Sequence, residues 1–323
     1  MKALVLIGGF GTRLRPVTYA VPKQLIPLAG KPMLYHVLDL LPPSVEEVVL
    51  ATGYKAEVVD RYVRDHPPAF PVRTVPEATP LGTGGGMKNA GDRMSDPFFL
   101  LNSDVVGDAD LAEMAVAHRR SPRLGTMALA EVEDTRPYGV AALGPEDRIT
   151  AFVEKPEPER APSHWINAGL AVWGAAVLDR IPAGRPVSFE QEVVPGLLGD
   201  GLFGFRLDGF WDDAGTRERL LRSQRFLFDA GRAPSTDRAT GATVRGHVAV
   251  LDGAEVAGAS LGPYVTIGHG ARVERGAHVE DAIVMDGAVV GAGARVVRSI
   301  VGPGETVDGG RHVVDTLVGT SPA

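Results

Sequence analysis

Two basic residues near the start of the chain follow a glycine-rich loop, and this arrangement suits an anionic ligand. Residues 4–7 form an apolar run of strand length, and the glycines of residues 8–11 come directly after it. Such glycines let main-chain N–H groups approach an anion that a Cβ atom would keep away. Arg13 suits bidentate binding of phosphate oxygens, whereas Lys23 is a compact point charge. The segment suggests a triphosphate site, although its spacing is neither that of a Walker loop nor G-x-G-x-x-G.

Acidic residues at two further positions could hold a metal ion, and that ion would neutralise part of the negative charge of such a ligand. Asp104 follows a predicted buried strand at residues 98–101, and Asp213 lies in the sequence GFWDDAG. Mg²⁺ prefers oxygen ligands and commonly takes one or two carboxylates together with substrate phosphates. As alternatives, Asp104 could cap a turn or a helix, and Asp212 could take the place of Asp213. Because the chain has no cysteine, a metal ligand must be an oxygen or an imidazole nitrogen.

Strands that alternate with helices must position these residues. Apolar runs predict strands at residues 48–52 and 98–101. Apolar spacings of three and four residues predict helices at residues 34–41, 56–63, 111–119 and 216–230. Such alternation is typical of a mostly parallel sheet covered by helices, which binds ligands at the carboxyl ends of its strands. The glycine loop and residues 102–104 both follow predicted strands, so one crevice could contain both.

The pattern changes after residue 241, where an aliphatic residue recurs every six positions. Val244 begins the first of four blocks with this period, which are separated by steps of five residues and have glycine and alanine between the aliphatic positions. This period is typical of a hexapeptide β-helix, with coils of roughly 18 residues. A flexible tail is the alternative, but it would not need to keep its valines in phase. We therefore predict an α/β domain with a Rossmann-like, mixed but mostly parallel sheet at residues 1–231, a linker at 232–241, and a β-helix of about four coils at 242–323.

Composition and charge exclude several kinds of partner. The chain has 323 residues, 44 % hydrophobic content and a formal net charge of −7, without a basic run. This balance argues against a surface for nucleic acid or for an anionic membrane. No apolar run is long enough to span a membrane, and the first residues lack the features of a signal peptide. Together with the absence of cysteine, these features predict a cytoplasmic protein that meets the charge of its ligand with local cations.

The longer strings around these residues resemble the signature of the sugar-1-phosphate nucleotidyltransferases. The resemblance begins with GGFGTRLRPVT, PK and PLAGKPM, and it continues in the family's order through EVVLATGY, PLGTGG, PFFLLNSDV, YGV, FVEKP, INAG, SFEQEVVP and GFWDDAG. Within the family, GGFGTRLRP is most similar to the mannose-1-phosphate guanylyltransferases. The resemblance implies transfer of a nucleotidyl group from GTP to mannose 1-phosphate, which gives GDP-mannose and pyrophosphate. It also implies Mg²⁺ as cofactor, a left-handed β-helix, and a homo-oligomer.

The resemblance assigns roles to individual residues, motif by motif. Its catalytic residues are Arg13, Lys23, Asp104 and Asp213, and the two aspartates are also its metal ligands. Its nucleotide-binding residues are Leu6, Gly8, Gly9, Gly11, Thr12, Arg13, Lys23, Glu77, Pro80, Gly82, Thr83 and Asn102. Its sugar-phosphate-binding residues are Gly139, Glu154, Lys155, Asn167 and Gly169. Glu77 could accept hydrogen bonds from guanine N1 and N2, and the segment lacks the glutamine-proline motif that is common in thymidylyl and uridylyl relatives.

Three alternatives remain open. A glucose-1-phosphate thymidylyltransferase or uridylyltransferase, or an enzyme that makes another GDP-sugar, would have a similar sequence. A non-catalytic sugar-nucleotide sensor would usually lack one of the four catalytic residues, but all four are present. A β-helix that also transfers an acyl group through His269 or His278 would generally have more coils and a long excursion loop.

Overall fold

A computed structural model of the chain describes residues 1–120, 123–234, 239 and 241–321, and it contains two compact units. Unit 1 consists of residues 1–9 and 37–211, and unit 2 consists of residues 10–36 and 212–323. We call residues 10–36 the signature segment; it carries Arg13 and Lys23 and belongs to unit 2. The domain boundaries at residues 231 and 242 stay a prediction, because the expected linker includes residues 235–238 and 240, which lie outside the described part.

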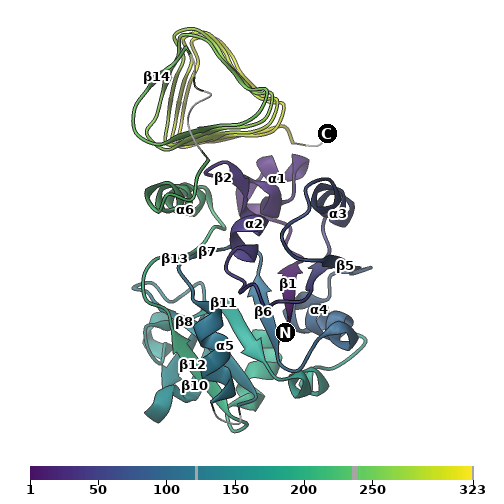
Figure 1. Cartoon of the computed structure of the whole chain (residues 1–323). Helices are drawn as coiled ribbons and strands as arrows, with labels where there is room; N and C mark the ends of the chain where they lie inside the picture. The colour runs from purple at the N-terminus through teal and green to yellow at the C-terminus, as the bar shows by residue number, and fades with distance from the viewer. Residues whose placement is uncertain (121–122, 235–238, 240, 322–323) are drawn as a thin grey trace. The chain divides into compact units, whose positions relative to one another are not determined.

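Unit 1 is built on a mixed sheet with the strand order β10-β9-β11-β6-β1-β4-β5 (Figure 1). Strand β8 also pairs with β11, and β12 pairs with β8. Strands β6, β1, β4 and β5 run parallel, whereas β11 is antiparallel to β6, β8 and β9. The strands of this sheet are β1 (Lys2–Ile7), β4 (Val48–Thr52), β5 (Val72–Pro76), β6 (Phe98–Asn102), β8 (Gly125–Glu131), β9 (Gly139–Leu143), β10 (Ile149–Glu154), β11 (Trp165–Trp173) and β12 (Leu202–Arg206). The Rossmann-like mixed sheet predicted from the sequence is confirmed.

The parallel strands β4 and β6 are largely buried, as their continuous apolar runs predict. Every residue of β4 is buried, and so are the first four residues of β6. Helix α4 packs against β1 and β4, α5 against β8 and β11, and α3 against β5. These helices are α3 (Ala56–Asp65), α4 (Gly82–Ala90) and α5 (Leu111–Arg119). The carboxyl ends of β1, β4, β5 and β6 therefore meet at one edge of the sheet.

The boundaries of α5 and α6 follow local chemistry. The Asp110 side chain accepts a hydrogen bond from the Glu113 N–H and begins α5. Thr216 caps α6 (Arg217–Asp229) in the same way, and this helix ends before Gly231, which has a φ of +68°. Helix α2 (Met33–Leu38) ends earlier than the predicted helix over residues 34–41, because a proline pair follows at 42–43. The shorter elements are α1 (Val17–Ala20), β2 (Pro27–Leu28), β3 (Lys31–Pro32), β7 (Val105–Gly107) and β13 (Trp211–Asp213).

The C-terminal part of unit 2 is a β-helix whose three parallel sheets form a triangular coil (Figure 1). Partner residues on neighbouring strands are 17 or 18 positions apart, as for Thr243 with Ser260 and Ser260 with His278. One sheet is β14 (Thr243–Val244), β17 (Ser260–Leu261), β20 (His278–Glu280), β23 (Arg295–Val297) and β26 (His312–Val314). The second is β15 (Val248–Val250), β18 (Val265–Ile267), β21 (Ala282–Val284), β24 (Ile300–Val301) and β27 (Leu317–Val318). The third is β16 (Glu255–Val256), β19 (Arg272–Val273), β22 (Val289–Val290) and β25 (Thr306–Val307).

The six-residue period predicted the core of this β-helix. Positions such as Leu261, Val273, Val290 and Val307 are buried in one hydrophobic cluster inside the coils. This is the architecture of the predicted left-handed hexapeptide β-helix. Val244 differs, because it is 38 % exposed. It lies in the first described coil, and among the described strands β14 has a partner, β17, on one side only.

A charge inside the coils should disrupt the β-helix. Val290 is fully buried, so Val290→Asp would place an unpaired carboxylate among aliphatic side chains. We expect the free energy of unfolding to fall by about 3 kcal/mol or more. Thermal unfolding followed by circular dichroism measures the change. Val314→Asp is the matched control, because Val314 is 42 % exposed in the same β-helix. Equal melting temperatures for the two variants would contradict the assignment of the core.

Candidate active site

The carboxyl ends of β1, β4 and β5 bring predicted nucleotide-binding residues together in unit 1. Gly8 follows β1, and a Cβ atom on Gly53, which follows β4, would lie 3.4 Å from the Cα atom of Gly8. Glu77 follows β5, and its N–H donates to the Thr52 carbonyl at 2.7 Å. A Cβ atom on Gly8 would lie 3.8 Å from a carboxylate oxygen of Glu77. Gly8 and Glu77 thus face each other at the edge predicted to bind the ligand.

Glu77 is held by the loop that precedes α4. Its Oε2 atom accepts a hydrogen bond from the Leu81 N–H at 3.0 Å. Burial raises the pKa of the Glu77 carboxyl above its ordinary value, and the Leu81 N–H opposes that shift. The side chain therefore supports the backbone between Pro80, which is exposed, and the first turn of α4.

Residues 187–190 form one wall of this loop, and sequence analysis did not assign them a role. Gly82 has a φ of +72°, and a Cβ atom there would lie 2.5 Å from the Val187 carbonyl oxygen, so only glycine fits. The Thr83 hydroxyl donates to Glu190 Oε2 at 2.6 Å and accepts from the Phe189 N–H at 2.9 Å. Glu190 lies in the sequence SFEQEVVP, which carried the resemblance but no residue assignment. That match was the signal that could have identified it.

The end of β6 meets an irregular part of β11, and this contact joins Asn102 to predicted sugar-binding residues. The register between β11 and β8 shifts between Asn167 and Ala171. The Asn167 side-chain oxygen accepts from the Gly169 N–H at 3.1 Å, and a Cβ atom on Gly169 would lie 2.6 Å from Asn102 Nδ2. Leu6 of β1 pairs with Asn102 in the adjacent strand. Asn102, Asn167 and Gly169 therefore form one polar cluster.

Glu154 and Gly139 form a second part of the predicted sugar pocket. They are paired residues of β10 and β9, and a Cβ atom on Gly139 would lie 2.6 Å from Glu154 Oε2. Lys155 Nζ lies 3.5 Å from Glu154 Oε1, and the lysine side chain is largely exposed. Burial raises the pKa of Glu154, the negative charge of Glu190 adds to the shift, and Lys155 opposes it. The charge of Glu190, which accepts a hydrogen bond from Thr83, therefore acts on the predicted sugar-binding residue Glu154.

Trp211 supports the same region, and sequence analysis assigned it no role. Its indole Nε1–H donates to the Ala168 carbonyl at 2.9 Å. The ring also packs edge-on against Tyr138 at a centroid distance of 5.4 Å. Because Ala168 lies between Asn167 and Gly169, Trp211 fixes the backbone of these two predicted sugar-binding residues.

Unit 2 gathers the predicted cations and one predicted metal ligand. Gly11 precedes the turn Thr12–Leu14, which contains Arg13, and its carbonyl accepts from the Thr18 hydroxyl at 2.9 Å. A Cβ atom on Gly11 would lie 3.4 Å from the Cβ atom of Lys23. A Cβ atom on Gly215 would lie 2.6 Å from Arg13 Nη2. Arg13 therefore lies beside the loop that begins at Asp213.

Two adjacent aspartates in this loop have different environments. Asp212 is fully buried, and its Oδ2 atom accepts from Arg222 Nε at 2.6 Å, whereas its Oδ1 atom has no hydrogen-bond partner in the described structure. Burial raises its pKa in spite of Arg222. The side chain of Asp213 is 20 % exposed and forms an ion pair with Arg219. Asp213 is therefore the more accessible of the two to a ligand, which favours Asp213 over Asp212 as the metal ligand.

The donor atoms fit a metal ion that takes few protein ligands. Among the residues that the structure describes, no three His, Asp or Glu side chains form a group that could hold a metal ion by themselves. Mg²⁺ commonly uses one or two carboxylates and completes its octahedron with phosphate oxygens and water. Asp104 and Asp213 are suitable donors of this kind. Asp104 belongs to unit 1 and Asp213 to unit 2, and their convergence stays a prediction.

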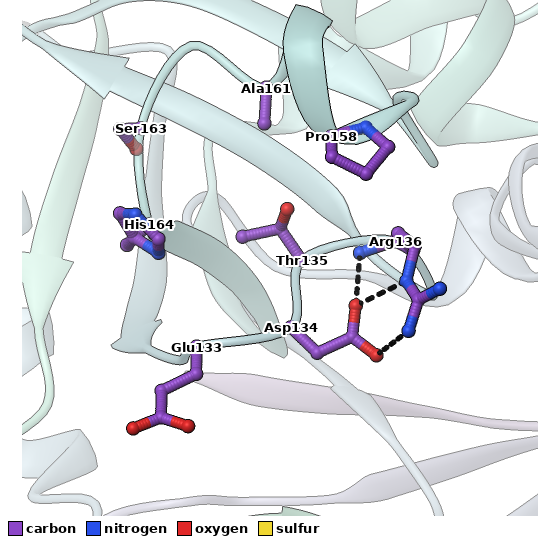
Figure 2. Close-up of a pocket in the computed structure, with 8 residues that line it drawn as sticks. All are labelled: Glu133, Asp134, Thr135, Arg136, Pro158, Ala161, Ser163 and His164. Carbon is purple, nitrogen blue, oxygen red and sulfur yellow. Dashed lines mark hydrogen bonds and ion pairs between the residues drawn. The ribbon is translucent and has the colours of Figure 1, made fainter.

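Outside these clusters, unit 1 has a cavity of about 410 Å³ that contains none of the predicted site residues (Figure 2). It lies between the loops that connect β8 with β9 and β10 with β11. Its lining residues are Glu133, Asp134, Thr135, Arg136, Pro158, Ala161, Ser163 and His164. Arg136 pairs with Asp134 at 2.8 Å, and the Ser163 hydroxyl donates to the Ala141 carbonyl at 2.6 Å. The first bond lies within the loop between β8 and β9, and the second ties the loop between β10 and β11 to β9.

Comparison with known proteins shows the family. A family model described as "Nucleotidyl transferase" matches residues 2–230, and one described as "GMPPB C-terminal domain" matches residues 244–321. The chain belongs to the nucleotidyl transferase family. No helix in the described part of this nucleotidyl transferase is both long and apolar enough to cross a membrane.

Relatives of this nucleotidyl transferase match most of its length. Mannose-1-phosphate guanylyltransferase of Mycobacterium tuberculosis is 40 % identical over 270 residues, which are 81 % of this chain and 73 % of the relative. A probable mannose-1-phosphate guanylyltransferase 2 of Oryza sativa subsp. japonica is 38 % identical over 277 residues, or 82 % of this chain and 76 % of the relative. The structure of HddC from Yersinia pseudotuberculosis complexed with GMP-PN has a TM-score of 0.57 and 26 % identity, and covers 70 % of this chain and 99 % of that one.

The raised pKa of Glu154 predicts how a substitution changes stability with pH. Because the folded state binds the Glu154 proton more tightly than the unfolded state, ionisation of Glu154 lowers the free energy of unfolding. Glu154→Gln removes this cost, so we expect it to melt about 2 °C higher than the parent at pH 7.5. The difference should disappear as the pH falls below about 4.5, where the carboxyl is protonated in both states.

Thermal unfolding at several pH values measures this difference between Glu154→Gln and the parent. Glu159→Gln serves as the control, because Glu159 is exposed and its substitution should not change the melting temperature at any pH. A Glu154→Gln variant that is less stable than the parent at pH 7.5 would refute the assigned environment of Glu154.

Proposed function

We propose that this protein transfers the guanylyl group of GTP to mannose 1-phosphate, giving GDP-mannose and pyrophosphate. The observation that carries the proposal is the 40 % identity over 81 % of the chain to the mannose-1-phosphate guanylyltransferase of M. tuberculosis. A phosphate oxygen of mannose 1-phosphate attacks the α-phosphorus of GTP. The bond from that phosphorus to the β-phosphate oxygen breaks, and pyrophosphate leaves. No covalent enzyme intermediate is required.

Arg13 and Lys23 of the signature segment supply the positive charge that this reaction needs to hold its two substrates together. Two phosphorylated substrates repel each other, so fixed positive charges must hold them in line. Arg13 is suited to the β- and γ-phosphates that leave as pyrophosphate, and Lys23 to the α-phosphate. The close packing of Gly11 on Thr18 and Lys23 supports this role, since it fixes the backbone that carries both cations before the substrate binds.

Guanine and mannose are assigned to neighbouring parts of unit 1. Glu77 and the loop from Pro80 to Thr83 bind the base, and Leu6, Gly8 and Gly9 lie beside the nucleoside. Glu154 and Asn167 accept from or donate to the sugar hydroxyls, Lys155 binds the sugar phosphate, and Gly139 and Gly169 let the sugar approach the backbone. The hydrogen bonds that join Thr83 to Glu190, and the contact between Asn102 and Gly169, support an arrangement in which base and sugar subsites share walls.

A divalent cation, which we propose is Mg²⁺, completes the site through Asp104 and Asp213. These two carboxylates would hold the ion, and it would lower the repulsion between the phosphate groups of the substrates. The Arg219 ion pair with Asp213 holds that carboxylate in one orientation. The proposal includes a cytoplasmic location and a homo-oligomer, both of which rest on the sequence alone.

An enzyme that makes another GDP-sugar is the second candidate, because HddC was solved in complex with GMP-PN and resembles this fold at 26 % identity. A panel of GTP, ATP, UTP and dTTP against mannose, glucose and galactose 1-phosphates separates these functions by pyrophosphate release. We expect GTP with mannose 1-phosphate to have the highest kcat/KM. If dTTP exceeds GTP with every sugar, the guanylyl assignment is wrong, and if no pair releases pyrophosphate, the proposed transfer to mannose 1-phosphate is wrong.

Loss of one metal-binding charge should abolish turnover without unfolding the protein. Asp104→Asn keeps the side-chain volume but removes the negative charge, so we expect kcat to fall by about 100-fold or more. Pyrophosphate release and the melting temperature are measured together. Asp92→Asn, an exposed aspartate at the surface of unit 1, should keep the parental kcat. Parental turnover in Asp104→Asn would remove Asp104 from the catalytic residues.

A further inference from the structure

The signature segment contacts the β-helix at two places; Lys23 lies between them in the sequence, and Arg13 lies just before the Pro16–Val17 contact. Both cations belong to the same compact unit as α6 and the coils of residues 241–321. The first contact is at Ala29 and Gly30, six and seven residues after Lys23. The second is at Pro16 and Val17, which follow Arg13 by three and four residues.

The first contact holds the turn between β2 and β3. Ala29 and Gly30 have φ values of +47° and +86°, and the Ala29 N–H donates to Gln224 Oε1 at 3.3 Å. A Cβ atom on Gly30 would lie 2.9 Å from Pro234 and 3.2 Å from Leu251, so the turn is packed directly against these side chains. The turn therefore depends on residues that come about 200 positions later in the chain.

Gln224 of α6 connects this turn to two coils of the β-helix. Its side chain is fully buried. Oε1 also accepts from the Thr266 hydroxyl at 2.7 Å, and Nε2 donates to the Tyr264 carbonyl at 2.9 Å and the Ala282 carbonyl at 3.3 Å. Both lone-pair sites of the amide oxygen and both N–H groups are thus used. A fully bonded buried amide fixes the relative positions of its partners, and its loss leaves each of them unpaired.

The second contact involves the last described coil. A Cβ atom on Gly319 would lie 3.1 Å from Pro16 Cγ and 3.2 Å from the Val17 nitrogen. A Cβ atom on Gly302 would lie 3.8 Å from Val17 Cγ2. The helix α1, which begins at Val17, is therefore in contact with the C-terminal end of the β-helix.

We propose that Gln224 is a positioning residue for the nucleotide site: it anchors the Ala29–Gly30 turn to the β-helix and so holds Lys23 and Arg13 in place for the triphosphate. The β-helix is then part of the support of the phosphate-binding segment. The sugar-phosphate residues Glu154, Lys155 and Asn167 belong to unit 1 and have no such link to Gln224. The kinetic consequence rests on the proposed function, whereas the anchoring itself does not.

Gln224→Leu tests the anchor, because it keeps similar volume and removes all four hydrogen bonds. We expect hydrogen exchange of the Ala29 amide and its neighbours in β2 and β3 to accelerate by about tenfold or more. We expect the KM for GTP to rise about tenfold and the KM for mannose 1-phosphate to stay within about twofold. Thr266→Val removes one of the four bonds and should shift both readouts in the same direction by a smaller factor, so it decides the question if Gln224→Leu does not fold.

Ser299→Ala is the matched control. Ser299 is also fully buried in the β-helix, where its hydroxyl donates to the Val297 carbonyl and accepts from the Thr316 N–H. It should lower the melting temperature without changing exchange at Ala29 or either KM. Unchanged exchange at Ala29 in Gln224→Leu, or in Thr266→Val if the first does not fold, overturns the anchor whatever the substrates are. Equal increases in both KM values, or a rise in GTP KM in Ser299→Ala, overturn the specific role in nucleotide positioning.

Discussion

The proposed reaction sets one electrostatic constraint on this structure, because an acidic protein must bring two polyanionic substrates together. A net charge of −7 offers no general attraction for nucleotides, so the positive charges have to be local and fixed. In the proposed function, Arg13 and Lys23 of the signature segment meet this requirement, and the backbone that carries them is packed closely around Gly11 and Thr18. Fixed charges stabilise the charge that develops during phosphoryl transfer without reorganising at that moment.

The two units divide the predicted functions between them. Unit 1 contains the residues assigned to the base and the sugar. Unit 2 contains Asp213 and the two basic residues assigned to the phosphates, Arg13 and Lys23. The π-like turn at residues 189–193 adds Glu190 to the wall of the base loop, and its charge also raises the pKa of Glu154. In the proposed function, substrate selection and phosphate chemistry are therefore assigned to different parts of the fold.

Periodic features of the structure were predictable from the sequence, and long-range contacts were not. The apolar runs of β1, β4 and β6 predicted the parallel strands, and the six-residue spacing predicted the buried positions of the β-helix, because both follow from the geometry of a single element. Gln224 gave no such signal. Its importance comes from Ala29, Tyr264 and Ala282, which are distant from it in the sequence and are brought together only by the tertiary fold.

The predicted site shows the same division. Gly8 lies beside Glu77, because each follows one of the parallel strands that end at one edge of the sheet, and Gly169 within β11 lies beside Asn102 at the end of β6. The binding roles of these residues stay a prediction. The sequence left Asp212 open as an alternative metal ligand to Asp213, and burial is what distinguishes the two side chains. The structural role of Trp211 depends on a hydrogen bond to Ala168 across the fold, which no motif encodes.

The central claim is that Asp104 and Asp213 bind one divalent cation together with the nucleotide. Binding of Mn²⁺ in the presence of GDP-mannose, followed by electron paramagnetic resonance, tests it most directly in the parent, Asp104→Asn, Asp213→Asn and the double variant. If the two carboxylates share the ion, each single variant weakens product-dependent Mn²⁺ binding, and the double variant is little weaker than the worse single one. Undiminished binding in either single variant, or losses that add in full, would contradict the account.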